Sequence, residues 1–242
     1  MKKIAILLAS LVAGSAMFAQ STTPSSSYKV SADFTYASDF VFRGIKQAGD
    51  SFQPSIEVTV DDFYVGLWTN QPIKNREYNE IDIYAGYKQS ITDVLQLDVI
   101  ATYYYYPEAE TQMTGKSYEV GAGVTYNYRG ISASVYGYYD FRLEATTFQA
   151  SAGYSFPIEP LGLSLDFSMY IGTVSARDAA PDALATGQHE AYNYYGADLT
   201  LPYHIRDNAI IHAGLHYASN DGEPIGADDN KLWFTLGLTI GF

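Results

Sequence analysis

The sequence predicts an all-β protein, a transmembrane antiparallel up-and-down β-barrel of about 12 strands. Three observations predict this fold. The C-terminal segment alternates between large apolar and mostly small or polar side chains, and the alternation recurs along the chain in segments long enough to cross a bilayer. Beyond residue 19, no run of 18 apolar residues is present that could form a transmembrane helix. The 23 tyrosines and 12 phenylalanines suit the aromatic girdles that flank the apolar band of such barrels.

Residues 1–19 have the features of a secretory signal peptide. Lys2 and Lys3 precede an apolar run that is too short to span a bilayer as a helix, and small residues follow it. We expect cleavage after Ala19, with cleavage after Ala16 as the alternative. The competing interpretation of this segment is a buried N-terminal helix.

The remaining chain is predicted to have two parts. Residues 20–27 are rich in Ser and Thr and should form a short flexible lead. Residues 28–242 should form the outer-membrane barrel as one domain. Export by the signal peptide would place this barrel in a bacterial outer membrane, in contact with its lipids.

The barrel is predicted from 12 alternating segments. Most have 9 to 13 residues, the length that a strand tilted by about 45° needs to cross a membrane. The first segment carries its outward set from Val30 to Phe42, and the tenth is the least regular. In order, the segments are 30–42, 52–60, 63–71, 78–89, 94–106, 117–127, 131–141, 146–156, 163–174, 190–202, 209–219 and 232–242.

The links between these segments alternate in length, as expected for short periplasmic turns and long extracellular loops. The short links are 61–62, 89–93, 128–130, 157–160 and 203–208, and the long ones are 44–51, 72–79, 107–116, 175–189 and 220–230. The short link 142–144 interrupts this rhythm where a long one is due. An even number of strands places both ends of the barrel in the periplasm.

The last segment predicts how the barrel is recognised for assembly. Large apolar side chains occupy every second position from Leu232 to Phe242, which puts them on one face of a strand. A terminal aromatic residue resembles the C-terminal signal by which the barrel-assembly machinery recognises outer-membrane proteins. The positions of that signal are filled by Thr235, Gly237, Ile240 and Phe242, with Ile240 where an aromatic residue is usual.

Composition excludes several classes of function. The chain has no cysteine, so it has no disulfide framework, no cysteine-based zinc site and no thiol nucleophile. Its formal net charge is −13, and loss of Lys2 and Lys3 with the signal peptide makes it −15. Such a chain repels nucleic acid, and no basic patch suggests otherwise. We therefore expect no nucleic-acid partner.

The segment from Tyr36 to Ile45 reads Y-A-S-D-F-V-F-R-G-I, and Gln53-Pro54 follows. It resembles the N-terminal motif of the TorF-type porin family (Gcw_chp) of bacterial outer-membrane proteins, S-D-Y-V-F-R-G-I-S-Q followed by a Q-P start to the next strand. Phe40 replaces the usual tyrosine and Lys46 the usual serine. The resemblance implies an outer-membrane barrel with porin activity, and it does not indicate the cargo.

Alternation through this motif predicts the positions of its side chains. Phe40 and Phe42 should lie on the outer surface in the upper aromatic girdle, and Gly44 should end the strand. Asp39 and Arg43 should then point inward near the extracellular mouth of the pore. They form either a rim pair that pins the first loop or a charge pair that selects solutes.

The alternate residues of each segment, between the outward-facing ones, should face the lumen and predict that it is acidic. Small polar residues leave space there, and carboxylates without bases need water. A hydrated lumen is therefore favoured over a filled barrel, and Lys88 and Lys231 are the only bases on this face. Glu80 shares the inner face, and the predicted pore-lining carboxylates are Asp33, Glu57, Asp82, Asp98, Glu119, Asp140, Asp166 and Asp198.

Together these features predict a channel for passive diffusion of small hydrophilic solutes, cationic or neutral, with no catalytic residue, metal or cofactor. His212 and His216 share a strand face but should lie about 13 Å apart, too far to bind one ion as a pair. Two alternatives stay open. One is a closed structural or adhesive barrel, and the other is an outer-membrane lipid hydrolase with a Ser-His pair on its outer surface.

Overall fold

The computed structural model describes residues 28–74, 79–108, 115–158, 163–176, 191–221 and 230–242. The predicted signal peptide (1–19) and flexible lead (20–27) lie outside the described residues, so both stay predictions. Within the described part, no helix has the length and apolar character to cross a membrane.

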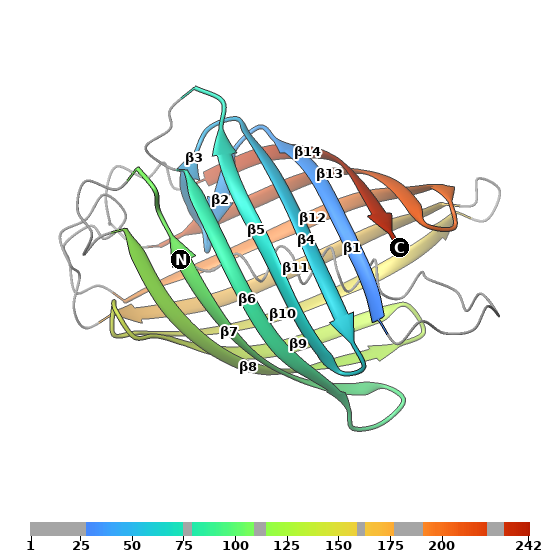
Figure 1. Ribbon diagram of the computed structural model, residues 1–242, viewed down its shortest axis with the longest axis horizontal. Coiled ribbons are helices and arrows are strands. Elements are labelled where there is room, and N and C mark those ends of the chain that lie inside the picture. Colours follow the sequence, from blue (N-terminus) through green and yellow to red (C-terminus); the bar gives the residue numbers. More distant parts are fainter. Residues whose placement is uncertain (1–27, 75–78, 109–114, 159–162, 177–190, 222–229) are drawn as a thin grey trace.

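Twelve strands form a closed antiparallel barrel (Figure 1), which confirms the predicted fold class. Each strand pairs with the next along the chain, and β1 closes the barrel by pairing with both β4 and β14. The wall strands are β1 (Tyr28–Ala37), β4 (Ser51–Val60), β5 (Phe63–Pro72), β6 (Glu80–Ser90), β7 (Leu95–Tyr105), β8 (Lys116–Tyr128), β9 (Ile131–Asp140), β10 (Ala145–Ile158), β11 (Leu163–Ala176), β12 (Ala191–Arg206), β13 (Ala209–Asn220) and β14 (Asn230–Gly241).

The two ends of the barrel differ. The turns at 61–62, 129–130 and 207–208 lie at one end, called here the turn end, together with the start of β1 and the end of β14. The opposite end, called here the loop end, carries the longer links. The short link 141–144 at the loop end is stabilised by Asp140, whose carboxylate accepts hydrogen bonds from the backbone N–H groups of Arg142 (3.0 Å) and Leu143 (2.8 Å).

Alternating burial along each strand separates an apolar outer face from a polar and aromatic inner face. In β5, Phe63, Val65 and Leu67 are exposed on the outside, whereas Tyr64 and Trp68 are buried inside. The same alternation holds around the barrel, and exposed Val, Leu, Ile, Phe and Tyr side chains occur on the outer face of every wall strand. Such a surface is stable in lipid and would be unfavourable in water.

Tyrosine rings on the inner wall lie over glycines of neighbouring strands. Tyr84 is the direct partner of Gly66 across β5 and β6, and a Cβ atom at Gly66 would overlap the Tyr84 ring. The glycine therefore provides the space in which the ring lies flat against the wall. The same arrangement pairs Tyr64 with Gly86, Tyr136 with Gly123, Tyr138 with Gly121, Tyr170 with Gly196, Tyr194 with Gly172 and His212 with Gly237.

The first wall strand ends earlier than the sequence predicted. β1 stops at Ala37, and the chain then forms a separate hairpin of β2 (Phe40–Phe42) and β3 (Ile45–Ala48). Phe40 and Phe42 are only 2% and 3% exposed, so their predicted position in the outer girdle is wrong. Alternation with a period of two tells which face of the sheet a side chain lies on only while the chain stays in the sheet. Here the chain leaves the sheet after the ten residues of β1, which are enough to span the wall.

Candidate functional site

The β2–β3 hairpin lies inside the barrel at its loop end and is the candidate functional site. In Figure 1 it lies within the outline of the barrel, near the end of β13 and the start of β14. Its turn residues, Arg43 (φ 47°) and Gly44 (φ 77°), both have positive φ, as in the two-residue turns that join tight hairpins. Of this pair, only Gly44 after Phe40-Val41-Phe42 is a turn signal in the sequence, because Asn, Asp or Gly usually precedes the glycine of such a turn.

Apolar side chains of the hairpin pack against widely separated parts of the wall. The rings of Phe40 and Trp68 on β5 are 5.6 Å apart, and Val41 forms a buried cluster with Ala218 on β13 and Trp233 on β14. Ile45 packs against a cluster on β11 and β12 that contains Tyr194. The hairpin thus extends across the lumen instead of lying along one side of it.

The turn of the hairpin fits closely against β12 and β13. The side-chain amide of Asn220 donates a hydrogen bond to the carbonyl oxygen of Gly44 (2.8 Å). A Cβ atom at Gly44 would overlap the Cβ of Tyr194 and the carbonyl oxygen of Ser219. Glycine is therefore required here both by its positive φ and by the lack of space.

Arg43 extends from this turn to the other side of the lumen. Its guanidinium donates hydrogen bonds to the hydroxyl of Thr147 on β10 and to the carboxylate of Glu119 on β8, the latter at 3.5 Å. Its Cζ atom lies 4.9 Å from the centre of the Tyr138 ring on β9. Asp39 instead pairs with Lys46 within the hairpin. Asp39 and Arg43 therefore each have another partner, and their role at the pore mouth stays a prediction.

The eight predicted pore-lining carboxylates all belong to the inner face, and their exposure divides them into two groups. Five are buried: Glu57, Asp82, Asp98, Glu119 and Asp140. Three are partly exposed: Asp33, Asp166 and Asp198. The division follows the wall. The buried group lies on β4 and on β6 to β9, and the exposed group lies on β1, β11 and β12.

Tyrosine and serine hydroxyls surround three of the buried carboxylates. Asp98 accepts hydrogen bonds from Tyr64 (2.9 Å) and Tyr136 (3.1 Å), and Glu57 accepts one from Tyr84 (3.1 Å). Lys88 acts electrostatically on both Asp98 and Glu57, and its Nζ atom lies 4.4 Å from the centre of the Tyr64 ring. On the same side of the barrel, Asp140 accepts hydrogen bonds from the Ser117 hydroxyl and from the 141–144 link. These carboxylates form part of the packed interior.

The three partly exposed carboxylates lie among hydroxyl groups and histidines. Asp33 is 2.8 Å from Nε2 of His212 and accepts a hydrogen bond from Thr239 (2.7 Å). Asp166 accepts one from Ser155 (2.5 Å). Further partly exposed inner-face groups line the same part of the wall, from β9 through β14 to β1: Ser132, Ser134, Gln149, Ser151, Ser168, Thr200 and Thr235. We call this part of the inner wall the polar strip.

His216 connects two residues of the polar strip. Its Nδ1 atom is 2.7 Å from Asp198 and its Nε2 atom is 2.9 Å from the Thr235 hydroxyl. This order resembles an activated nucleophile, but acyl transfer also needs free donors for the oxyanion. Thr235 lies within β14, which pairs with β13 on one side and β1 on the other, so its backbone belongs to two ladders. The arrangement is therefore interpreted as a structural hydrogen-bonded chain.

The described part of the chain assembles no metal site of three or more ligands. No group of three or more His, Cys, Asp or Glu side chains is placed there to hold a metal ion. His212 and His216 face the lumen and are bonded to Asp33 and Asp198. The outward Ser-His pair that the lipid-hydrolase alternative requires therefore cannot include them.

The residues of the predicted assembly signal lie at the closing seam of the barrel. Phe242 is 74% exposed, and its backbone N–H donates to the carbonyl oxygen of Val30 (2.8 Å). Gly237 faces inward beneath His212, and Ile240 pairs with Ala32 on β1. With Thr235 bonded to His216, two of the four residues have structural roles inside the barrel. Recognition by the assembly machinery stays a prediction.

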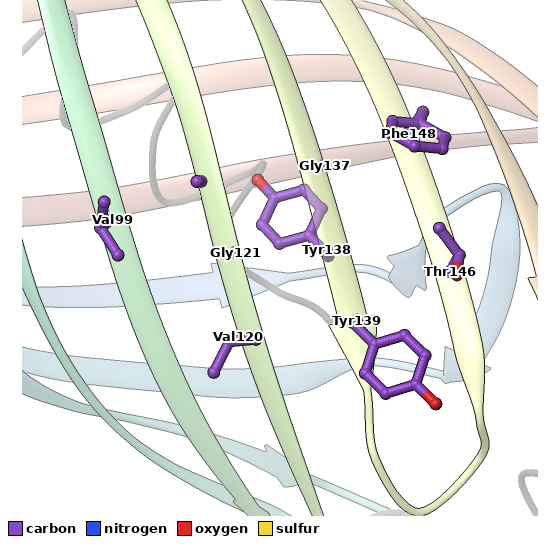
Figure 2. Close-up of a pocket in the computed structure, with 9 residues that line it drawn as sticks. Val99, Val120, Gly121, Gly137, Tyr138, Tyr139, Thr146 and Phe148 are labelled. Carbon is purple, nitrogen blue, oxygen red and sulfur yellow. The ribbon is translucent and has the colours of Figure 1, made fainter.

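An apolar groove of about 390 Å³ lies on the outer face, not in the lumen. Figure 2 shows its lining, in which Val99, Val120 and Phe148 surround the space left by Gly137. Tyr139 borders this groove, whereas Tyr138, the preceding residue, is buried on the inner side of β9. The groove is a feature of the lipid-facing surface and is not part of the candidate site.

Comparison with known proteins gives one family match. The family model described as a bacterial protein of unknown function (Gcw_chp) matches residues 21–154, which is more than half of the chain. That description names no activity, so the TorF-type porin assignment stays a prediction. No curated protein matches the sequence significantly.

The solved structures that are similar to the chain include porins and channels. The KdgM porin in complex with disordered oligogalacturonate is 10% identical with a TM-score of 0.57, covering 88% of this chain and 99% of that one. The NanC porin is 10% identical with a TM-score of 0.55, covering 87% and 98%. An outer-membrane channel from Pseudomonas putida F1 is 8% identical with a TM-score of 0.50, covering 91% and 97%. At these identities the likeness shows the fold alone.

Proposed function

The chain belongs to the Gcw_chp family of bacterial proteins, and we propose that it is an outer-membrane channel for passive diffusion of small hydrophilic solutes, with a preference for cationic over anionic ones. The apolar outer face would contact membrane lipids. Export by the predicted signal peptide and insertion by the barrel-assembly machinery belong to the same proposal. The similar folds of known porins and channels support it.

The polar strip is the observation that carries this proposal. Its carboxylates and hydroxyls are partly exposed, whereas the predicted pore-lining carboxylates on β4 and on β6 to β9 are buried. Solutes would therefore move along β9 to β14 and β1, past Asp33, Asp166 and Asp198. Hydroxyl groups on this path would replace part of the hydration shell of a polar solute. The solute would therefore keep hydrogen-bond partners while it passes through the lumen.

The charge of the inner face supports the cation preference. Nine inner-face carboxylates stand against Arg43, Lys88 and Lys231, so acids predominate even with the hairpin included. Walls of low dielectric constant focus such a field along the axis and raise the local concentration of cations. The three carboxylates of the polar strip are the ones that water, and therefore a solute, can reach.

A second candidate function is a closed structural barrel. The observation that favours it is the hairpin, which extends across the lumen and buries Arg43. If the hairpin stays in this position, the lumen ends there and no solute passes. Conductance separates the two candidates.

The test is a planar-bilayer recording of the full-length protein with a potassium chloride gradient. The channel proposal expects conductance and a reversal potential that favours potassium. Changing Asp33, Asp166 and Asp198 together to Asn should reduce that preference. The matched control changes Asp61, Asp93 and Asp207 to Asn, which removes the same charge from exposed turns and links and should have a smaller effect.

Three results would overturn parts of the proposal. Absence of conductance in both the wild type and a variant lacking residues 40–48 would favour the closed barrel. A preference for chloride would contradict the role of the lumen charge. An equal effect of the two triple variants would place the selectivity outside the polar strip.

A further inference from the structure

The geometry points to a binding site for a guanidinium or ammonium group at the loop end of the lumen, occupied in this structure by Arg43 of the chain itself. When the hairpin moves away, a cationic solute takes the place of Arg43. The binding site stands on the structure alone, whereas its use by a passing solute rests on the proposed channel function.

Three adjacent wall strands build this site. Glu119 on β8 contributes a carboxylate, Tyr138 on β9 an aromatic ring and Thr147 on β10 a hydroxyl. All three side chains are at least nine-tenths buried. A carboxylate supplies charge-assisted hydrogen bonds, and a ring face attracts a cation within about 6 Å of its centre. The combination selects a planar or compact cation and excludes anions and neutral apolar groups.

The turn itself does not explain why arginine occupies position 43. At φ 47° a side chain is disfavoured, and Asn, Asp or Gly is usual at this position of the turn. The turn at Arg129-Gly130 has nearly the same geometry, with φ 49° and 81°. Arg129 is exposed, however, and packs only over the neighbouring Tyr128 ring among the contacts of the described residues. Arg43 differs by its buried partners, so those partners account for the choice of side chain.

The hairpin can leave without breaking the barrel. β2 and β3 form their own two-stranded sheet and are not part of the barrel ladder. β1 pairs with β4 from Ala37↔Ser51 onward, so the wall is complete without the hairpin. Displacement of the hairpin would free the site while leaving Glu119, Tyr138 and Thr147 on rigid strands.

The experiment removes the internal cation and supplies a free one. Arg43→Asn suits the positive φ and keeps the turn, and Arg129→Asn is the matched control at an exposed turn. Methylguanidinium is the probe, and methylurea is its neutral counterpart of similar shape. Thermal unfolding in detergent micelles should show a saturable rise of the midpoint for Arg43→Asn with methylguanidinium. No such rise is expected with methylurea, in Arg129→Asn, or in the double variant Arg43→Asn/Glu119→Gln.

A second measurement uses the wild-type protein and does not depend on the variants folding. Trypsin cleaves after arginine, and the exposed Arg129 provides an internal reference for the 7% exposed Arg43. Methylguanidinium should compete with Arg43 for the site and raise the rate of cleavage at Arg43 relative to Arg129. An unchanged ratio, or a thermal shift of equal size in the double variant, would overturn the proposed site.

Conductance separates this inference from the channel function. If the channel proposal holds, Arg43→Asn should conduct more than the wild type, and methylguanidinium should block its current. If no form of the protein conducts, the channel proposal fails, and the thermal and proteolytic results still decide whether the cation site exists.

Discussion

Leu236 provides a sharp test of the membrane-spanning surface. It is the seventh of the 12 residues of β14, is 55% exposed on the outer face, and lies between Tyr36 on β1 and Ala213 on β13. Leu232 lies on the same face of the same strand, four residues nearer the loop end, and is 67% exposed. Four residues of a strand tilted by about 45° correspond to roughly 10 Å along the membrane normal.

This difference in depth sets the expected energies. Leu236→Arg places a charge near the middle of the apolar band and should destabilise the barrel by about 2–4 kcal/mol, whereas Leu232→Arg near the interface should cost about 0–1 kcal/mol. The larger cost corresponds to a decrease of roughly 30- to 700-fold in the ratio of folded to unfolded protein. Denaturant titration in phospholipid vesicles measures both, with fluorescence from the buried Trp68 and Trp233. Equal costs at the two positions would refute the placement of the membrane midplane, and a harmless Leu236→Arg would refute a lipid-facing outer surface.

The C-terminal aromatic residue, the ring packing on the inner wall and the charge of the lumen can each be tested separately. Phe242→Ala keeps the backbone hydrogen bonds to Val30 and removes only the aromatic group. The amount of barrel in the outer membrane should fall relative to Phe234→Ala, a control on the same face. Such a loss would support the assembly signal, and normal levels would contradict it. Gly86→Ala forces the Tyr64 ring off the wall and should lower the free energy of unfolding by about 1–3 kcal/mol in the same denaturant titration. Gly49→Ala is the control and should be neutral, because a Cβ atom there meets no atom within 4 Å. Equal effects of the two variants would argue against the ring packing. The preference for potassium should fade in 1 M salt, where the Debye length is about 3 Å, and a preference that persists there would point to a cause other than the field of the lumen.

The barrel could be predicted because its physical requirements recur in every strand. A segment that faces lipid on one side and a polar lumen on the other must alternate, and the membrane sets its length. The predicted segment 209–219 differs from β13 by one residue for this reason. The sequence predicts that the tenth segment, its least regular one, ends at Pro202. β12 instead continues past Pro202, which pairs with His212, and reaches Arg206 after an irregularity in register.

The hairpin could not be placed by the same reasoning. Arg43 meets Glu119 and Thr147, which are 76 and 104 residues away in the sequence, and no local pattern encodes such contacts. The apolar residues around Arg43 were compatible with either the lipid-facing surface or an interior position. The division of the carboxylates into a buried and an accessible group depends on where the hairpin and the tyrosine rings lie, so it also required the structure.

Because the hairpin is attached at both ends, Arg43 competes with free cations for its binding site in the lumen. Residues 38–50 are joined at both ends to β1 and β4, which are neighbours in the wall, so Arg43 remains an intramolecular ligand even when it is displaced. A short flexible connection of this kind gives an effective concentration on the order of millimolar. A free cation must reach at least that concentration to replace Arg43, because the apolar contacts of Phe40, Val41 and Ile45 also hold the hairpin in place. Scarce solutes would therefore leave the hairpin in place. Lengthening the connection would lower this threshold only slowly, because the entropy of loop closure changes with the logarithm of loop length.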